Sequence, residues 1–89
     1  MRQVPRRCRH EIIAAVLEYL STAGRARISS VALHANMPLD RARVLMGELQ
    51  FYGLVESITD ERGRRYYRVS ERGMEYLRLW RRLRLLAGY

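Results

Sequence analysis

Two kinds of apolar spacing follow one another along this 89-residue chain. Over residues 10–52, apolar side chains recur every three or four positions, which is the spacing of helices that pack one face against a core. Residues 54–69 are instead rich in branched and aromatic side chains, as pairs of strands are. From residue 71 the helical spacing returns. This order of helices, hairpin and helix leaves few folds open to the chain.

The first two helices are predicted from their apolar residues and from the residues that start and stop helices. The stripe over residues 10–22 predicts the first helix, which ends before Gly24 because glycine suits a helix C-terminus. Residues 25–28 fit a short edge strand. The second helix is expected over residues 30–35, with the hydroxyl of Ser29 as its N-terminal cap.

A tight turn and a third helix follow. Residues 36–38 end the second helix, because Pro38 has no amide donor and disfavours helical geometry in the residue before it. The third helix is predicted over residues 39–52, with Gly53 at its end. One face of this helix is apolar and predicted to be buried. That face consists of Ala42, Leu45, Met46 and Leu49.

A β-hairpin and a last helix complete the pattern. Strands are expected at residues 54–59 and 64–69, joined by a loop at residues 60–63. Ser70 is placed to cap a helix over residues 71–87. Helices followed by such a hairpin are typical of a winged helix-turn-helix, in which the hairpin is called the wing. The predicted fold is therefore α+β and mostly α: three helices and a two-stranded wing, with an additional C-terminal helix.

The same pattern divides the chain into three parts. Residues 1–9 carry several arginines and form either a basic N-terminal arm or an extension of the first helix. Residues 10–70 form the winged helix-turn-helix domain. Residues 71–89 form the C-terminal amphipathic helix.

Arginine dominates the charge of the chain. Its 17 basic residues are all arginine, and with 9 acidic residues they give a formal net charge of +8. Such a surplus attracts polyanions such as nucleic acids. Arginine also grips phosphate or a guanine edge through two parallel hydrogen bonds, which lysine cannot do. A GC-rich genome would produce the same preference for arginine, so composition alone leaves both explanations open.

Cysteine and histidine are scarce. Cys8 is the only cysteine, which excludes a disulfide within one chain and fits a reducing, intracellular compartment. One cysteine and two histidines are too few for a structural zinc site, and no nucleophile–base arrangement or glycine-rich phosphate loop is recognisable. We therefore expect no metal, no cofactor and no enzymatic activity. No apolar run is long enough to span a bilayer, and the expected location is cytoplasmic.

Four segments make the chain similar to a known family. Residues 27–29, 32–36, 53–56 and 67–73 resemble the small archaeal winged helix-turn-helix DNA-binding proteins of about 10 kDa, a mass close to the 10.5 kDa of this chain. The most specific stretch, Ser70-Glu71-Arg72-Gly73, is similar to the family's Thr-Glu-Lys-Gly. The resemblance implies binding to double-stranded DNA by a homodimer that is held together by an antiparallel pair of C-terminal helices.

Such a fold indicates which residues would contact DNA. The N-terminal half of the third helix enters the major groove, and the wing contacts phosphate or the minor groove. The residues of the third helix that are predicted to face DNA are Asp40, Arg41, Arg43, Val44 and Gly47. Those on the wing are Arg62, Arg64 and Arg65. At the start of the second helix, Ser29 and Ser30 can donate hydrogen bonds to phosphate.

The last helix carries a candidate dimer interface. Its apolar residues follow the spacing of the a and d positions in a coiled coil. The predicted interface consists of Tyr76, Leu79, Trp80, Leu83 and Leu86. Phe51 lies off the apolar stripe of its own helix, which leaves two explanations. It belongs to a subunit interface, or it packs under a last helix that folds back across it.

These observations favour a homodimeric transcription regulator or an abundant chromosome-associated protein of the nucleoid. A different hypothesis is a protein-interaction module of a larger transcription or replication complex, since a fold does not fix a function. In that case Arg43 and the wing arginines should be dispersed or paired with acids. A third hypothesis places the last helix on a membrane surface, because its arginines lie opposite leucine and tryptophan. A dimer interface accounts for the same pattern, and we predict no membrane partner.

Overall fold

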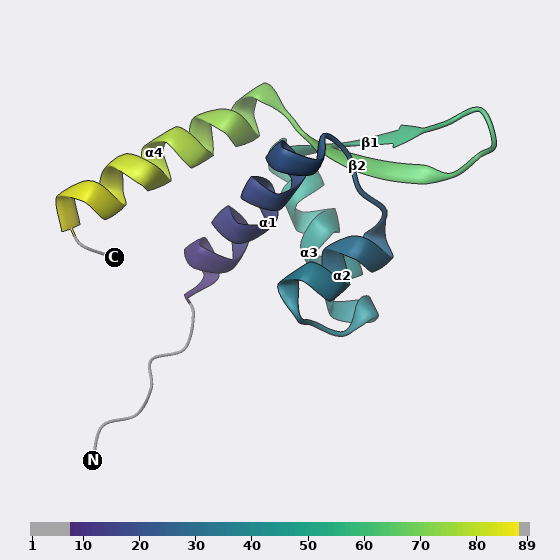
Figure 1. Ribbon diagram of the computed structural model, residues 1–89, viewed down its shortest axis with the longest axis horizontal. Coiled ribbons are helices and arrows are strands. Elements are labelled where there is room, and N and C mark those ends of the chain that lie inside the picture. The colour runs from purple at the N-terminus through teal and green to yellow at the C-terminus, as the bar shows by residue number, and fades with distance from the viewer. Residues whose placement is uncertain (1–7, 88–89) are drawn as a thin grey trace, which may run out of the picture.

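Residues 8–87 are described here by a computed structural model of the chain. In order, they form helices α1 (Arg9–Ala23), α2 (Ile28–Ala35) and α3 (Leu39–Phe51), strands β1 (Val55–Thr59) and β2 (Arg65–Val69), and helix α4 (Glu71–Ala87). Helices α1 to α3 pack together, while the hairpin extends away on one side and α4 on the other (Figure 1). The predicted fold is confirmed. Most of the predicted N-terminal arm, residues 1–7, lies outside the described residues.

The core lies where the apolar faces of three helices meet. Leu17 and Leu20 of α1, Met46 and Leu49 of α3, and Leu77 of α4 are all fully buried. Each such side chain stabilises the fold by about 1.5–3 kcal/mol relative to an exposed position. The whole apolar face predicted for the third helix is buried, so that prediction is confirmed.

Helix α1 begins and ends close to its predicted limits. The carboxylate of Glu11 accepts a hydrogen bond from the amide of Cys8, at 2.9 Å, and so satisfies a donor before the first turn. At the other end Gly24 has a φ of 85° and its amide donates to the Leu20 carbonyl. This backbone conformation favours glycine and ends the helix.

Helix α2 begins earlier than predicted, and the proposed Ser29 cap is wrong. The helix starts at Ile28, so both Ser29 and Ser30 lie in its first turn, and the capping residue is Arg27. The cause is a contact that is distant in sequence. Ala26 exchanges two backbone hydrogen bonds with Tyr67, of 2.9 and 2.8 Å, which keeps the chain extended until residue 27. The predicted edge strand is thus reduced to a single bridging residue.

The turn between α2 and α3 has the predicted location. Asn36 adopts the left-handed conformation with a φ of 56°, and Pro38 is extended and caps α3. Asparagine tolerates this conformation better than most residues do. The two helices of the helix-turn-helix are therefore joined by three residues, at positions 36–38.

The wing is an antiparallel pair in which Val55 lies opposite Val69 and Thr59 opposite Arg65. Side chains alternate between its two faces, so the buried Tyr67 lies on the same face as Arg65. The core contact of Tyr67 and its bonds to Ala26 fix the base of the wing. The tip extends beyond the core.

A compact joint connects the wing to α4. Ser70 is buried, its hydroxyl donates to the Gly53 carbonyl at 2.6 Å, and it accepts from the Gly73 amide at 3.0 Å. The predicted Ser70 cap is therefore confirmed. Its own amide donates to the Leu54 carbonyl. Gly73 packs so closely against Leu54 that a Cβ atom there would collide with the Leu54 carbonyl oxygen.

Helix α4 has the predicted length, but its fully buried residues lie only in its first half. Gly73 and Leu77 are its buried residues. Phe51 at the end of α3 is 85% exposed, so α4 does not fold back across it. The explanation of Phe51 by packing under the last helix is therefore wrong.

Candidate nucleic-acid interface

Helix α3 presents a polar, open face opposite its buried one. Asp40, Arg41, Arg43, Val44 and Gly47, all predicted to face DNA, are exposed. Because each residue turns the helix by about 100°, Arg41 and Arg43 lie on opposite flanks of this face with Val44 and Gly47 between them. Val44 is 64% exposed, so its methyl groups are open to contact.

One flank of α3 meets the wing in a crevice. Arg43, Gly47 and Gln50 of α3 line it on one side. Arg65 and Tyr67 of β2, together with Ile28, line the other side of this space of about 300 Å³. The structure therefore brings together Arg43 and Gly47, predicted on the third helix, with Arg65, predicted on the wing. Gln50 was missed, although it follows Gly47 at helical spacing and so lies on the same flank.

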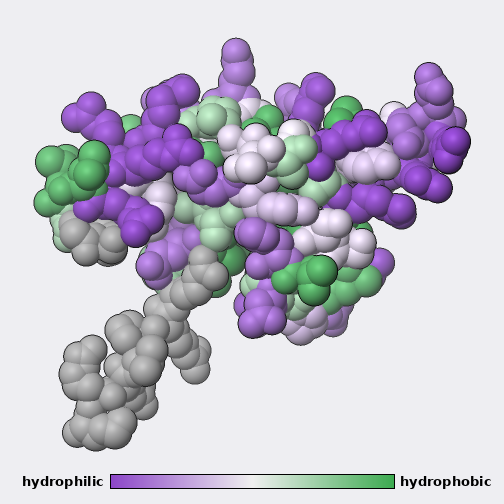
Figure 2. All heavy atoms as spheres, viewed as in Figure 1, coloured by the Kyte–Doolittle hydropathy of each residue, from purple (hydrophilic) through white to green (hydrophobic). Residues whose placement is uncertain are grey.

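The tip of the wing is held by an aspartate. One carboxylate oxygen of Asp60 accepts from the amides of Arg64, at 2.8 Å, and Arg62, at 2.9 Å. These two bonds hold the pKa of Asp60 below its ordinary value, and the bond from Arg64 has the larger effect. The turn therefore leaves both arginine side chains directed to solvent. Figure 2 shows hydrophilic side chains gathered over this end of the molecule.

Arg25 is a basic residue beside the wing that the sequence did not single out. Its guanidinium carbon lies 4.1 Å from the centre of the Tyr66 ring, a cation–π contact. Arg25 also lines a hollow at the wing tip with Asp60 and Arg62. Sequence alone gave no signal for this contact, because it depends on the pairing of Ala26 with Tyr67.

The basic residues of this surface differ in their pairing from those elsewhere. Within residues 8–87, the ion pairs are Arg9–Glu48, Arg68–Glu56, Arg78–Glu75 and Arg81–Glu18. None involves Arg43 or the predicted wing arginines. Their charges are left available to an external anion.

The remaining predicted residues lie elsewhere. Ser29 is exposed and Ser30 half-buried in the first turn of α2. On α4, Tyr76 is half-buried and its hydroxyl lies 2.9 Å from Nδ1 of His10, and burial raises the pKa of Tyr76. Trp80 is half-buried and lines a hollow with residues of α1. The other predicted interface residues of α4 are exposed. They are Leu79, Leu83 and Leu86.

Within residues 8–87, no three histidine, cysteine or acidic side chains come together as a metal site would require. In that part of the chain, no helix combines the length and the apolar character needed to cross a membrane.

Comparison with solved structures identifies the same architecture in larger proteins. A MarR-family transcriptional regulator from Silicibacter pomeroyi aligns with a TM-score of 0.75 and 18% identity, over 86% of this chain and 56% of its own. A second regulator of that family from the same organism aligns with a TM-score of 0.70 and 21% identity, over 83% of this chain and 51% of its own. The PcaV transcriptional regulator from Streptomyces coelicolor, solved with its natural ligand, aligns with a TM-score of 0.68 and 19% identity. The alignment covers 85% of this chain and 59% of PcaV.

These identities show a shared fold, and this chain spans only about half to three fifths of the length of those proteins. No curated protein sequence matches the chain. The profile of the winged helix-turn-helix family, in contrast, matches residues 6–88. Because that match covers nearly every residue, the chain belongs to the winged helix-turn-helix family.

Proposed function

We propose that this protein is a DNA-binding transcription regulator that inserts α3 into the major groove and lays the wing along the adjacent backbone. The observation that carries this proposal is the crevice in which Arg43 of α3 and Arg65 of the wing lie together without acidic partners. Two arginines without acidic partners, one on α3 and one on the wing, can supply a contact to a base edge and a contact to the phosphate backbone.

Each residue of this surface has a chemical role in the proposal. Arg43 donates to the edge of a guanine, Val44 contacts a thymine methyl group, and Gly47 allows the backbone to approach the bases. Asp40 accepts from a cytosine amine. The residues that hold phosphate or the minor groove are Arg41, Arg62, Arg64 and Arg65, with Ser29 and Ser30 as donors at the start of α2.

Titration against duplex DNA at rising salt concentrations tests this function. Each phosphate that the protein neutralises releases counterions, so the affinity should fall steeply and linearly on a logarithmic scale. Absence of binding even at low salt would refute the proposal. Comparison of several duplexes separates two forms of it: a strong sequence preference identifies a specific regulator, and none identifies an architectural protein of the nucleoid.

The unpaired arginines favour a DNA partner over the protein-interaction hypothesis. A module for protein partners was expected to disperse or neutralise Arg43 and the wing arginines, and no ion pair within residues 8–87 involves them. We therefore retain DNA as the proposed partner.

The proposal includes a homodimer formed through α4. Leu79, Leu83 and Leu86 lie on one side of the helix and are 60%, 43% and 80% exposed. A two-fold dimer would bury them and present two copies of α3 to successive turns of the major groove. This arrangement matches the antiparallel helix pair that the similarity to the small archaeal proteins implies.

Replacing Leu83 by aspartate tests the dimer. The charge would have to enter an apolar interface, so Leu83→Asp should leave a monomer in sedimentation equilibrium. The fold should persist, because Leu83 is already partly exposed in a single subunit. The matched control is Leu85→Asp, which makes the same change at an 86% exposed leucine on the opposite side of α4. A Leu83→Asp protein that still dimerises would show that α4 is not the interface.

A further inference from the structure

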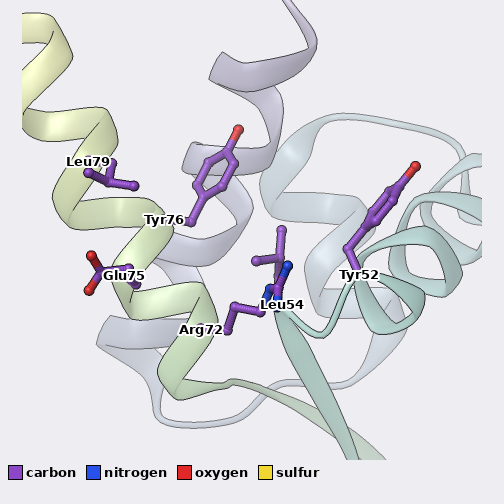
Figure 3. A pocket seen from close by; sticks show the side chains of 6 residues that line it. All are labelled: Tyr52, Leu54, Arg72, Glu75, Tyr76 and Leu79. Atoms are coloured by element: carbon purple, nitrogen blue, oxygen red, sulfur yellow. The ribbon is translucent and has the colours of Figure 1, made fainter.

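A groove separates the end of α3 from α4 (Figure 3). Tyr52 stands on one side of it and Leu79 on the other, with Leu54 and Tyr76 between them. Arg72 and Glu75 complete a lining that encloses about 490 Å³ and is mainly apolar. The groove lies apart from the crevice between α3 and the wing, and shares no lining residue with it.

The groove opens into a longer apolar surface. Tyr76, Leu79, Leu83 and Leu86 follow one another at steps of three and four, so Leu83 and Leu86 extend the same side of α4 beyond the groove. The Phe51 ring makes an edge contact with the Tyr52 ring, with 5.5 Å between the two ring centroids. Phe51 is itself 85% exposed. A continuous apolar surface of this kind is uncommon on a protein that stays monomeric.

The charges of α4 are distributed unevenly along its length. The half that forms the groove contains Glu71 and Glu75 together with Arg72 and Arg78, so its charges balance. The far half contains no acid, and its charged residues are Arg81, Arg82 and Arg84. An antiparallel second copy would place its basic half beside the electrically balanced half of the first. A parallel copy would place basic beside basic.

The length of α4 determines where such a copy would end. From Arg72 to Leu86 the helix rises by roughly 20 Å. In a two-fold antiparallel pair, the end that carries Leu83 and Leu86 therefore reaches the start of the other α4, which is the position of the groove. The exposed leucines at the C-terminal end of one α4 could therefore fill the apolar groove at the N-terminal end of the other α4.

We propose that the groove holds the Leu83–Leu86 end of α4 from a second copy of this chain, and that Tyr52 and Phe51 are therefore part of the dimer contact. This inference rests on the proposed homodimer and adds a second surface to it. The end of α3 touches the partner directly. The distance between the two copies of α3 is then fixed by a contact at their own ends as well as by the pairing of α4.

Substitution of Tyr52 tests the groove. Tyr52→Asp should raise the dimer dissociation constant about tenfold or more in sedimentation equilibrium, because it places a charge in the wall that receives an apolar helix end. Tyr52→Phe keeps the ring and should leave the constant close to that of the unaltered protein. If Leu83→Asp gives a monomer while Tyr52→Asp dimerises normally, the dimer stands and the groove contact is refuted. A protein that is monomeric throughout refutes both.

A spin label identifies the occupant. We would replace Cys8 by serine and place the label at Leu85→Cys, off the proposed interface, then mix this protein with an isotope-labelled copy that carries no spin label. The amide signals of Leu54 and Tyr76 in the isotope-labelled copy should broaden, and broadening should disappear when both copies carry Leu83→Asp. Unbroadened groove signals in a mixture that is dimeric would overturn the proposal. Occupation of the groove by residues 1–7 of the same chain would also overturn the proposal. It would be recognised if deleting residues 1–7 from a monomeric sample shifted the amide signals of Leu54 and Tyr76.

Discussion

Replacing Gly73 by alanine is expected to destabilise the protein by about 3 kcal/mol, a large part of the stability of a small domain. The added Cβ would collide with the carbonyl oxygen of Leu54 and with a methyl group of Val69. Backbone cannot move aside as a flexible side chain does, so the joint between wing and α4 would have to open. Urea denaturation followed by circular dichroism measures the change.

Gly47→Ala is the matched control for this substitution. Gly47 also lies within a helix, but a Cβ atom there would meet nothing within 4 Å. Alanine at this position should stabilise the protein by about 0.5–1 kcal/mol, because glycine costs that much in a helix interior. Equal effects of the two substitutions would contradict the packing assigned to Gly73. The same Gly47→Ala protein should bind DNA less well if the backbone of α3 approaches the bases there.

Removal of Arg43 or Arg65 is expected to reduce affinity for duplex DNA about 5- to 150-fold in each case, from a loss of roughly 1–3 kcal/mol per contact. The two substitutions should differ in character. Arg43→Ala removes a contact to base edges and should relax the preference for one base pair. Arg65→Ala removes a phosphate contact, so it should weaken binding to all sequences and lower the salt dependence by about one counterion. Fluorescence anisotropy at several salt concentrations separates these effects.

Arg78→Ala controls for the loss of one positive charge. Arg78 lies on α4, where it forms an exposed ion pair with Glu75 of the same helix, and exposed pairs of this kind contribute little to stability. DNA affinity should change only slightly in this variant. If Arg78→Ala weakens binding as much as Arg43→Ala does, the protein binds through its overall charge, and the surface formed by α3 and the wing has no special role.

Much of the fold could be predicted from sequence because its causes are local. The apolar stripe of α3 depends only on helical spacing, and all four of its predicted residues are buried. The limits of α4 were predicted correctly because Ser70 and its neighbours carry a capping signal within four residues. The turn at residues 36–38 is likewise determined by Pro38 and by the residues next to it.

The errors concern contacts between segments that are distant along the chain. The start of α2 and the position of Arg25 both depend on the pairing of Ala26 with Tyr67, which no local pattern reveals. The direction of α4 beyond Leu77, and hence the exposure of Phe51, depends on the joint at Ser70 and Gly73. The residues of the candidate site were predicted from the docking geometry of the fold, and their contacts with DNA remain a proposal.

The hydrogen bonds of Ser70 have a consequence for how such a protein changes during evolution. Because this buried hydroxyl is bonded both to the loop after α3 and to the first turn of α4, the two helices cannot rotate independently. In the proposed dimer, a substitution that alters how two copies of α4 meet would therefore also move both copies of α3. New spacings between half-sites would then arise from mutations on α4, while the residues proposed to contact the bases stay the same.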